Sequence, residues 1–186
     1  MQGFEPLFQE LRLWKVGPYI PADCVLVDLG CDEEMTLLKR WQPKLTKGIG
    51  IDIVVEPQQI DNIEIIQADI TQRLPLKSNT ADVVTMLAVL EHLPNPEQVL
   101  KEAFRILKPG GIFLVTVPSA HSQPLLEMLA KINVVRQEMV DQHHNYFTHQ
   151  QLHHITAAAG FDEIFIESWE LGCNTFMRAT KPSKSS

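Results

Sequence analysis

Cysteine is scarce in this chain, and its spacing argues against two common uses of the residue. The three cysteines, Cys24, Cys31 and Cys173, are an odd number, widely spaced and without a CxxC pair. A disulfide framework and a zinc site are therefore not expected. We predict that the protein holds no metal and works in a reducing, cytoplasmic compartment.

Long apolar runs and basic clusters are missing as well. No run is long enough to span a membrane, and the first fourteen residues, MQGFEPLFQELRLW, lack the basic and apolar regions of a signal peptide. The formal net charge is −7 at pH 7, and no basic run stands out. We therefore expect neither a membrane nor a nucleic acid as a partner.

The length and hydrophobic content suit one globular domain with a substantial core. The chain has 186 residues, of which 45% are hydrophobic. We expect a single domain over residues 1–186, with an N-terminal cap segment at 1–22 and a candidate lid at 119–146. The polar end of the chain, 181–186, is expected to be a disordered tail.

Segments of helix type and strand type alternate along the chain. Helices are expected over 4–16, 33–41, 96–107 and 149–159, and strands over 24–29, 48–54, 63–68, 81–87, 112–117, 163–169 and 173–179. This alternation predicts an α/β fold: a Rossmann-like, doubly wound, mainly parallel sheet with helices on both faces. Ligands of such sheets bind beyond the carboxyl ends of the strands.

Two of the helices carry capping signals at their starts. Asn95 is a candidate N-cap, with Pro96 at the first helical position and Gln98 where the partner in a capping box belongs. Thr148 and Gln151 have the same spacing at the start of the last helix. We expect a capping box at both places.

An acidic turn follows the first strand and bears on the choice of cofactor. Residues 30–34 read GCDEE, and Asp52 closes the second strand, where an acidic side chain can accept hydrogen bonds from ribose hydroxyls. An Asp at a strand end is also a common turn residue. Carboxylates would repel the pyrophosphate of a dinucleotide, whereas S-adenosylmethionine has no phosphate and a net positive charge.

Six segments then follow in a recognisable order: VLVDLGC (25–31), GIDI (50–53), QADI (67–70), ADVVTMLAVLEHL (81–93), RILKPGGIFLVTVP (105–118) and HHNYFTHQQLHHITAAAGF (143–161). In this order and spacing they resemble the class I S-adenosylmethionine-dependent methyltransferases, of the small-molecule type with EHL after strand four. The resemblance implies a seven-stranded sheet whose last strand is antiparallel to the rest. It also implies methyl transfer to a small-molecule acceptor.

The resemblance also assigns positions in the site. Those on the cofactor side are Asp28, Gly30 and Cys31 in the first motif, Asp52 at the ribose, Ile53 as a further cofactor contact, Asp69 and Ile70 at the adenine, and Leu87 beneath the cofactor. Those on the substrate side are Glu91, His92, His143, His144 and Tyr146. His92 is the candidate catalytic base, because histidine titrates near neutrality. A structural role for His92, and loop packing for the other histidines and Tyr146, remain alternatives.

The first motif departs from the family pattern at two positions. Asp32 and Glu34 stand where the family usually has its second and third glycines. If position 32 needs a positive φ, Asp is among the less costly residues there. We hypothesise that Asp32 accepts a hydrogen bond from the ammonium of the cofactor, and that residues 32–34, in a first helical turn, favour the helix dipole.

Several alternatives stay open at the level of the sequence. The altered glycine turn favours a non-catalytic relative that keeps the fold as a binding or regulatory domain. A nicotinamide-dependent oxidoreductase is disfavoured by the charge of the turn. His149 and His153 have a metal-binding spacing, but no further ligand is convincingly placed, so a solvated helix face is preferred. A small, apolar acceptor is expected, and open access to the site for a macromolecule stays an alternative.

Overall fold

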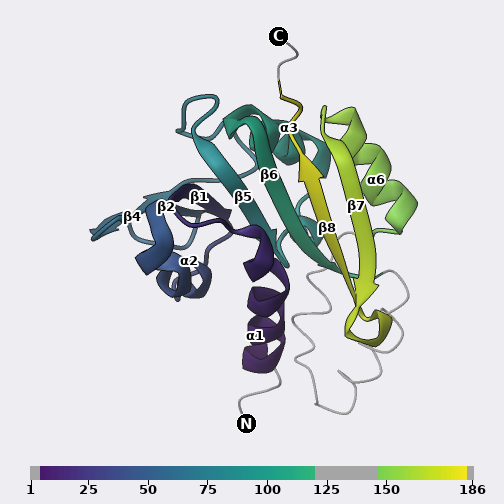
Figure 1. Cartoon of the computed structure of the whole chain (residues 1–186), viewed down its shortest axis with the longest axis horizontal. Helices are drawn as coiled ribbons and strands as arrows, with labels where there is room; N and C mark the ends of the chain where they lie inside the picture. Colours follow the sequence, from purple (N-terminus) through teal and green to yellow (C-terminus); the bar gives the residue numbers. More distant parts are fainter. Residues whose placement is uncertain (1–4, 120–145, 184–186) are drawn as a thin grey trace.

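The computed structural model describes residues 5–119 and 146–183 (Figure 1). The helices are α1 (Glu5–Val16), α2 (Thr36–Trp41), α3 (Pro96–Ile106) and α6 (His149–Ala158), and the short 3₁₀ helices are η1 (Gly17–Tyr19), η2 (Gln42–Lys44), η3 (Leu90–His92) and η5 (Glu170–Gly172). The strands are β1 (Cys24–Leu29), β2 (Leu45–Asp52), β3 (Gln58–Ile60), β4 (Ile63–Gln67), β5 (Ala81–Leu87), β6 (Leu107–Pro118), β7 (Asp162–Trp169) and β8 (Asn174–Thr180).

These eight strands form one sheet in the order β3-β4-β2-β1-β5-β6-β8-β7. Strands β4, β2, β1, β5 and β6 run parallel to one another. Strand β8 is antiparallel to both β6 and β7, so the last strand opposes the main direction. The predicted mainly parallel sheet with an antiparallel last strand is confirmed, and the structure adds the three-residue edge strand β3, which is antiparallel to β4.

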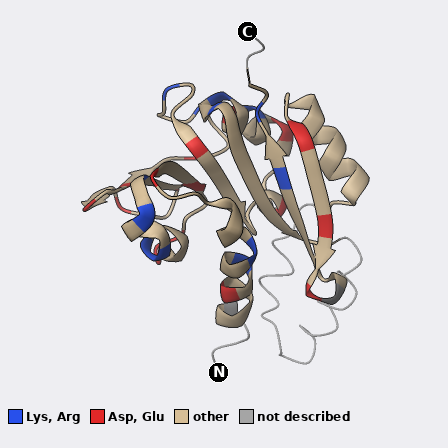
Figure 2. Cartoon of the chain, viewed as in Figure 1, with Lys and Arg blue, Asp and Glu red and all other residues tan. Residues whose placement is uncertain are grey.

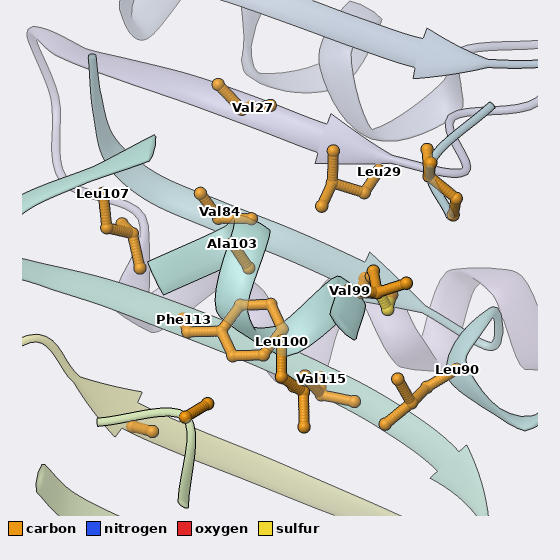
Figure 3. Close-up of a cluster of buried hydrophobic side chains, with 14 of the residues drawn as sticks. Val27, Leu29, Val84, Leu90, Val99, Leu100, Ala103, Leu107, Phe113 and Val115 are labelled. Atoms are coloured by element: carbon orange, nitrogen blue, oxygen red, sulfur yellow. The ribbon is translucent and has the colours of Figure 1, made fainter. Parts of the chain in front are cut away.

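Helices cover both faces of the sheet, as the alternation predicted. On one face, α3 and α6 pack over a buried apolar cluster, to which the sheet contributes residues such as Val27, Val84 and Phe113 (Figure 3). On the other face, α1 and α2 contribute Leu13 and Leu38 to a second buried cluster. Because β1 and β5 are covered on both sides, their sequences are almost wholly apolar.

The helix after the first strand starts later than predicted. It begins at Thr36 and has no acidic residue in its first turn. Asp32 and Met35 both have positive φ values, 57° and 50°, which a right-handed helix does not allow. Residues 32–34 therefore form a turn, and the prediction that they favour a helix dipole is wrong.

The two predicted capping boxes have different outcomes. At α6, the Thr148 hydroxyl accepts from the backbone N–H of Gln151, whose side chain accepts from the N–H of Thr148, so this box is confirmed. At α3, Asn95 occupies the N-cap position without a side-chain hydrogen bond, and the N–H of Gln98 donates to the backbone carbonyl of Asn95 instead. The capping box at Asn95 is therefore a wrong prediction.

Strand β6 starts five residues earlier than predicted. Its pairing with β5 shifts between Ala81–Leu107 and Val83–Ile112, so an irregularity interrupts the ladder there. Gly110, with a φ of +79°, lies within this irregularity. The sequence KPGG at 108–111 predicts the end of a helix. In the structure these residues also belong to β6.

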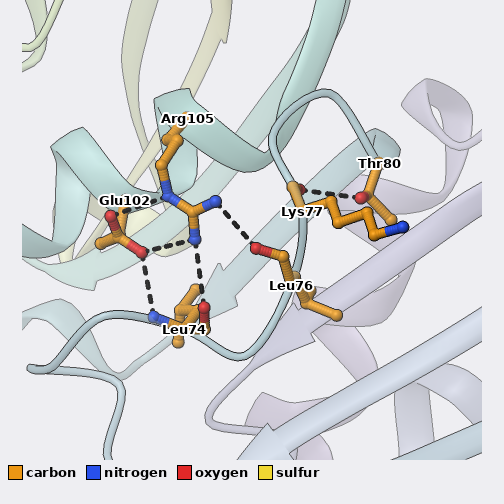
Figure 4. A network of polar contacts seen from close by, with 6 residues as sticks. All are labelled: Leu74, Leu76, Lys77, Thr80, Glu102 and Arg105. Atoms are coloured by element: carbon orange, nitrogen blue, oxygen red, sulfur yellow. Dashed lines mark hydrogen bonds and ion pairs between the residues drawn. The ribbon is translucent and has the colours of Figure 1, made fainter.

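A polar network fixes the connection between β4 and β5 to α3 (Figure 4). The Arg105 guanidinium donates to the carbonyls of Leu76 and Leu74, at 2.8 and 3.2 Å, and to the Glu102 carboxylate. Glu102 in turn accepts from the backbone N–H of Leu74, at 2.9 Å. The hydrogen bond from Arg105 holds the pKa of Glu102 below its usual value.

Lys181, the first residue of the predicted tail, is hydrogen-bonded to the rest of the protein. The Lys181 ammonium donates to the carbonyls of Phe104 and Leu107, at 2.8 and 2.7 Å. Residues 184–186, the end of the predicted tail, lie outside the described residues, so the disordered tail stays a prediction. The candidate lid also lies outside them, apart from its ends at 119 and 146.

The charges of the described residues are mixed. Figure 2 shows acidic and basic residues side by side along α1, where Glu10 and Arg12 are both found.

None of the helices in residues 5–119 and 146–183 is long and apolar enough to cross a lipid bilayer.

Candidate functional site

The parallel strands bring the predicted cofactor residues to one rim of the sheet. In the register, Asp28 lies opposite Gly50 on β2 and opposite Thr85 on β5. The carboxyl ends of β1, β2, β4 and β5 therefore meet at the same edge. Ligands of open parallel sheets bind at this edge.

The turn after β1 requires a glycine at position 30. Gly30 has a φ of +80°, and its N–H donates to the carbonyl of Ile51 at 2.8 Å. A Cβ atom on Gly30 would lie 2.4 Å from Val89 Cγ2. The turn after β1 is therefore packed directly against the segment that follows β5.

Asp52 joins the end of β2 to this turn. Its Oδ2 accepts from the backbone N–H of Asp32 at 3.1 Å, and its Oδ1 accepts from the N–H of Val54 at 3.2 Å. Asp32 has the positive φ that the glycine pattern indicated, and its own Oδ1 accepts from the N–H of Glu33 at 2.6 Å. The backbone N–H groups of residues 32 and 33 thus already donate to carboxylates.

This arrangement does not fit a pyrophosphate and fits a phosphate-free cation. Dinucleotide sites present free backbone N–H groups to the phosphates at the start of a helix. Here the amides of residues 32 and 33 serve Asp52 and Asp32, and further carboxylates stand beside them. A ligand with a sulfonium and an ammonium would instead find acceptor oxygens.

Asp28 lies beneath the turn as a buried carboxyl group, 5% exposed. The Thr85 hydroxyl donates to its Oδ1 at 2.6 Å. Burial, with a smaller contribution from the charge of Asp52, raises the pKa of Asp28 to about 7, although the hydrogen bond from Thr85 acts in the opposite direction. The group therefore titrates near neutrality in the folded protein.

The side chain of Cys31 belongs to the core rather than to the rim. It is 5% exposed and lies in the buried cluster under α1 and α2. A Cβ on Gly50 would lie 2.7 Å from its sulfur, so the thiol fills the space that this glycine leaves. Burial, followed by the negative charges of Asp28 and Asp52, raises the pKa of Cys31 to about 12. Its thiol stays protonated at neutral pH and is not a nucleophile.

The predicted adenine side lies beside Asp52 on the same rim. The N–H of Ala68 donates to the carbonyl of Asp52, and the Gln67 amide donates to the carbonyl of Ile53. The side chain of Ile53 is exposed, whereas Ile70 is buried.

Asp69 lies just beyond this pair of contacts, and its Oδ1 accepts from both the N–H and the hydroxyl of Thr71, at 2.9 and 2.7 Å. The hydroxyl bond is the main reason that the pKa of Asp69 is lowered. Asp69 thus builds the local turn that follows β4. Leu87, at the end of β5, is half-buried against the cluster under α1.

Glu91 and His92, which were predicted on the substrate side, lie on η3 directly after β5. The Glu91 side chain is 1% exposed, that of His92 is 35% exposed, and Glu91 Oε1 lies 4.0 Å from His92 Nε2. Burial raises the pKa of Glu91 to about 7, while the positive charge of Arg12 on α1 acts to lower it. Glu91 Oε2 has no hydrogen-bond partner within residues 5–119 and 146–183.

Tyr146 is the remaining substrate-side prediction within the described residues, and it lies near the end of β6. Phe147 forms an isolated parallel bridge with Ser119, so its neighbour Tyr146 is placed at the carboxyl end of that strand. His143 and His144 lie outside the described residues. Among the residues that are described, no cluster of three metal ligands occurs, and His149 Nε2 is hydrogen-bonded to the Ser168 hydroxyl at 3.0 Å.

Sequence reasoning missed three residues that hold the site together. Thr85 is a polar residue in an apolar strand, which is a signal that it needs a buried partner. Gly50 is a glycine inside a strand, which indicates close packing. Val89 carries no comparable signal, because its contact with Gly30 depends on the register of β1 and β5.

Residues 5–164 match a family described as a methyltransferase domain, which is most of the chain. The chain belongs to this methyltransferase family. Membership confirms the family resemblance seen in the sequence and implies the use of S-adenosylmethionine as methyl donor.

The curated relatives that are similar to this chain are also named as methyltransferases. A Brucella canis protein named ubiquinone/menaquinone biosynthesis C-methyltransferase UbiE is 34% identical over 80 residues, which cover 43% of this chain and only 29% of that relative.

Two solved structures share the fold. An S-adenosylmethionine-dependent methyltransferase from Thermotoga maritima has a TM-score of 0.68 at 21% identity, covering 91% of this chain and 87% of that one. A Haemonchus contortus phosphoethanolamine N-methyltransferase, in complex with phosphomonomethylethanolamine and S-adenosylhomocysteine, has a TM-score of 0.71 at 14% identity, covering 94% of this chain and 53% of that one. Both likenesses bear on the fold alone.

Proposed function

We propose that the protein transfers a methyl group from S-adenosylmethionine to a small-molecule acceptor by in-line displacement. The observation that carries this proposal is the acidic turn after β1, whose amides at residues 32 and 33 donate to carboxylates. A phosphate-bearing cofactor would lack donors there, whereas a cationic one would gain acceptors. Membership of the methyltransferase family supports the same conclusion.

The cofactor roles follow from the geometry of the rim. In the proposal, the Asp52 carboxylate accepts from the ribose hydroxyls, Asp69 and Ile70 border the adenine, and Ile53 is a further cofactor contact. The turn of Asp28, Gly30, Cys31 and Asp32 faces the methionine part, with the backbone rather than the thiol of Cys31 in contact. Leu87 lies beneath the cofactor.

The chemistry demands little of the protein beyond alignment. The sulfonium supplies an already activated methyl group, so positioning of the acceptor accounts for much of the rate. A base is needed only where the acceptor must lose a proton. We propose that His92 helps to remove this proton, because it is partly exposed at the rim and can exchange protons with water. Tyr146, His143 and His144 are proposed to border the acceptor.

The acceptor class is a finer proposal. The relatives named for ubiquinone and menaquinone biosynthesis support a small, apolar acceptor, and their matched stretch is less than a third of their length. We further propose a single domain over residues 1–186 and a cytoplasmic location, the latter supported by three free cysteines. The net charge of −7 supports the absence of nucleic-acid binding.

The second candidate is a non-catalytic binding or regulatory domain. The feature that favours it is the altered turn, in which Asp32 and Met35 are strained non-glycine residues with positive φ. A thermal-shift titration separates the two candidates. The proposed function predicts that millimolar S-adenosylmethionine raises the melting temperature and that NADH does not, because a ligand of the native state stabilises it. Absence of a shift with S-adenosylmethionine favours the second candidate.

A further inference from the structure

Glu91 stands out as a buried acid, one of whose carboxylate oxygens has no hydrogen-bond partner among the described residues. Its side chain is 1% exposed, and its Oε2 has no hydrogen-bond partner in residues 5–119 and 146–183. Buried carboxylate oxygens are nearly always hydrogen-bonded in folded proteins, because desolvation without a partner is costly. An unpartnered oxygen of this kind points to a group that is bound from outside the chain.

The surroundings of Glu91 lie next to the rim at which the cofactor is proposed to bind. Glu91 lies on η3, four residues after Leu87 closes β5, and beyond the Val89 that packs on the Gly30 turn. The groups that face it are Arg12 from α1 and His92 from its own turn. The carboxylate thus lies between the cofactor rim and the N-terminal helix.

A second unused polar atom lies close to the same strand end. Thr116 on β6 is opposite Leu87 in the register, and the N–H of Ala88 donates to its carbonyl at 2.9 Å. The Thr116 hydroxyl is buried, also without a hydrogen-bond partner in the described residues. The carboxyl ends of β5 and β6 therefore both hold polar atoms that the described part of the protein does not satisfy.

We propose that Glu91 is the residue that binds the proton-bearing group of the acceptor, a hydroxyl or an amine, and takes its proton. The inference rests on the proposed function and adds the class of acceptor. Oε2 accepts the O–H or N–H hydrogen. The lone pair of the acceptor forms the new bond to the methyl carbon, and the electron pair of the broken S–C bond stays on sulfur. The proton goes to the Glu91 carboxylate and leaves to solvent by way of His92, whose Nε2 lies 4.0 Å from Oε1.

The test compares wild type, Glu91→Gln and Glu97→Gln. Glu97 is an exposed acid on α3, so its substitution serves as the matched control. Methyl transfer from labelled S-adenosylmethionine is measured with catechol, 1,4-dihydroxynaphthalene, benzylamine and putrescine, and with thioanisole as an acceptor without an exchangeable proton. S-adenosylhomocysteine affinity is measured by calorimetry on the same preparations. The phenols and the amines distinguish a hydroxyl acceptor from an amine acceptor.

We expect wild type and Glu97→Gln to methylate at least one hydroxyl or amine compound. We expect Glu91→Gln to lower kcat for it by about 10²- to 10⁴-fold with unchanged S-adenosylhomocysteine affinity. Retained kcat in Glu91→Gln, loss of cofactor affinity in parallel with rate, or transfer to thioanisole alone overturns the inference. So does transfer to none of the compounds by a protein that binds S-adenosylhomocysteine. Failure of wild type to bind S-adenosylhomocysteine refutes the proposed function itself. The calorimetric titration detects that failure independently of the methyl-transfer assay.

Discussion

At the scale of single residues, the carboxylates of the acidic turn and of Asp52 accept successive backbone hydrogen bonds. Asp52 accepts from the amide of Asp32, and Asp32 accepts from the amide of Glu33. The carboxylates thus take over the amides that a phosphate would use. The turn loses affinity for anions and gains acceptors for a cation, which is the physical basis of the proposed cofactor choice.

Asp32 gives the first test at this scale. If its carboxylate accepts a hydrogen bond from the ammonium of the cofactor, Asp32→Asn should weaken S-adenosylhomocysteine binding by about tenfold, the value of one hydrogen bond to a charged group. Glu33→Gln is the matched control, since it removes a neighbouring charge without removing the proposed contact. Calorimetric titration measures both, and equal affinities of wild type and Asp32→Asn would sink this role.

Gly30 and Gly172 form a second comparison of single residues. Both have a positive φ, +80° and +88°, but a Cβ would meet Val89 at 2.4 Å in the first and no atom within 4 Å in the second. Gly172→Ala should cost about 1 kcal/mol from backbone strain alone. Gly30→Ala should cost roughly 1–3 kcal/mol more, because the turn must also move away from Val89. Urea denaturation checks this, and equal losses would show that the packing is looser than the distances indicate.

At the scale of elements, the sequence predicted the buried strands best. The bounds of β1 and β5 match the prediction, because runs covered on both faces are apolar throughout and end where polar residues begin. The start of α2 was not predictable in the same way. Asp32 has its left-handed conformation where its N–H donates to Asp52 at the end of β2, and a single sequence does not reveal that contact.

The same limit applies to the candidate site. The motif positions Asp28, Asp52 and Asp69 could be named from the sequence, and the structure brings their strand ends to one rim. Their partners could not be named. Thr85 reaches Asp28 only because β1 and β5 are paired in a particular register, and that register is a property of the folded sheet.

The two helix starts give a matched prediction at the element scale. Thr148 and Asn95 are both exposed N-cap residues, but only Thr148 has a side-chain capping bond. Thr148→Ala should lower the free energy of unfolding by about 1 kcal/mol. Asn95→Ala should change it by less than about 0.5 kcal/mol. Chemical denaturation of the two variants measures the difference, and an equal loss in both would contradict the assigned capping.

At the scale of the whole molecule, the buried acid Glu91 links folding stability to pH. Its pKa is about 7 in the folded protein against a usual value of 4.5, so the folded state keeps a proton that the unfolded state releases. The contribution of the protonated Glu91 to the free energy of unfolding is therefore fully present below about pH 4.5. It is lost as the pH rises from about 4.5 to about 7.

This linkage predicts how Glu91→Gln changes the pH dependence of stability. Wild type should lose about 2–3 kcal/mol more than Glu91→Gln between pH 5 and pH 8, because the variant has no proton to release. Glu97→Gln, at an exposed position, should follow wild type. Urea denaturation at both pH values provides the free energies. Parallel pH dependence in wild type and Glu91→Gln would mean that Glu91 is not the buried acid described.

The proposed site as a whole combines a cofactor rim built by β1, β2, β4 and β5 with a proposed acceptor side at η3 and α1. A crystal structure with S-adenosylhomocysteine tests this account most directly. The account predicts ribose hydroxyls within hydrogen-bond distance of the Asp52 carboxylate, the methionine part over the Gly30 turn, and the sulfur directed toward the Glu91 side. A ligand bound away from the Gly30 turn, or one that leaves Asp52 without a contact, would contradict it.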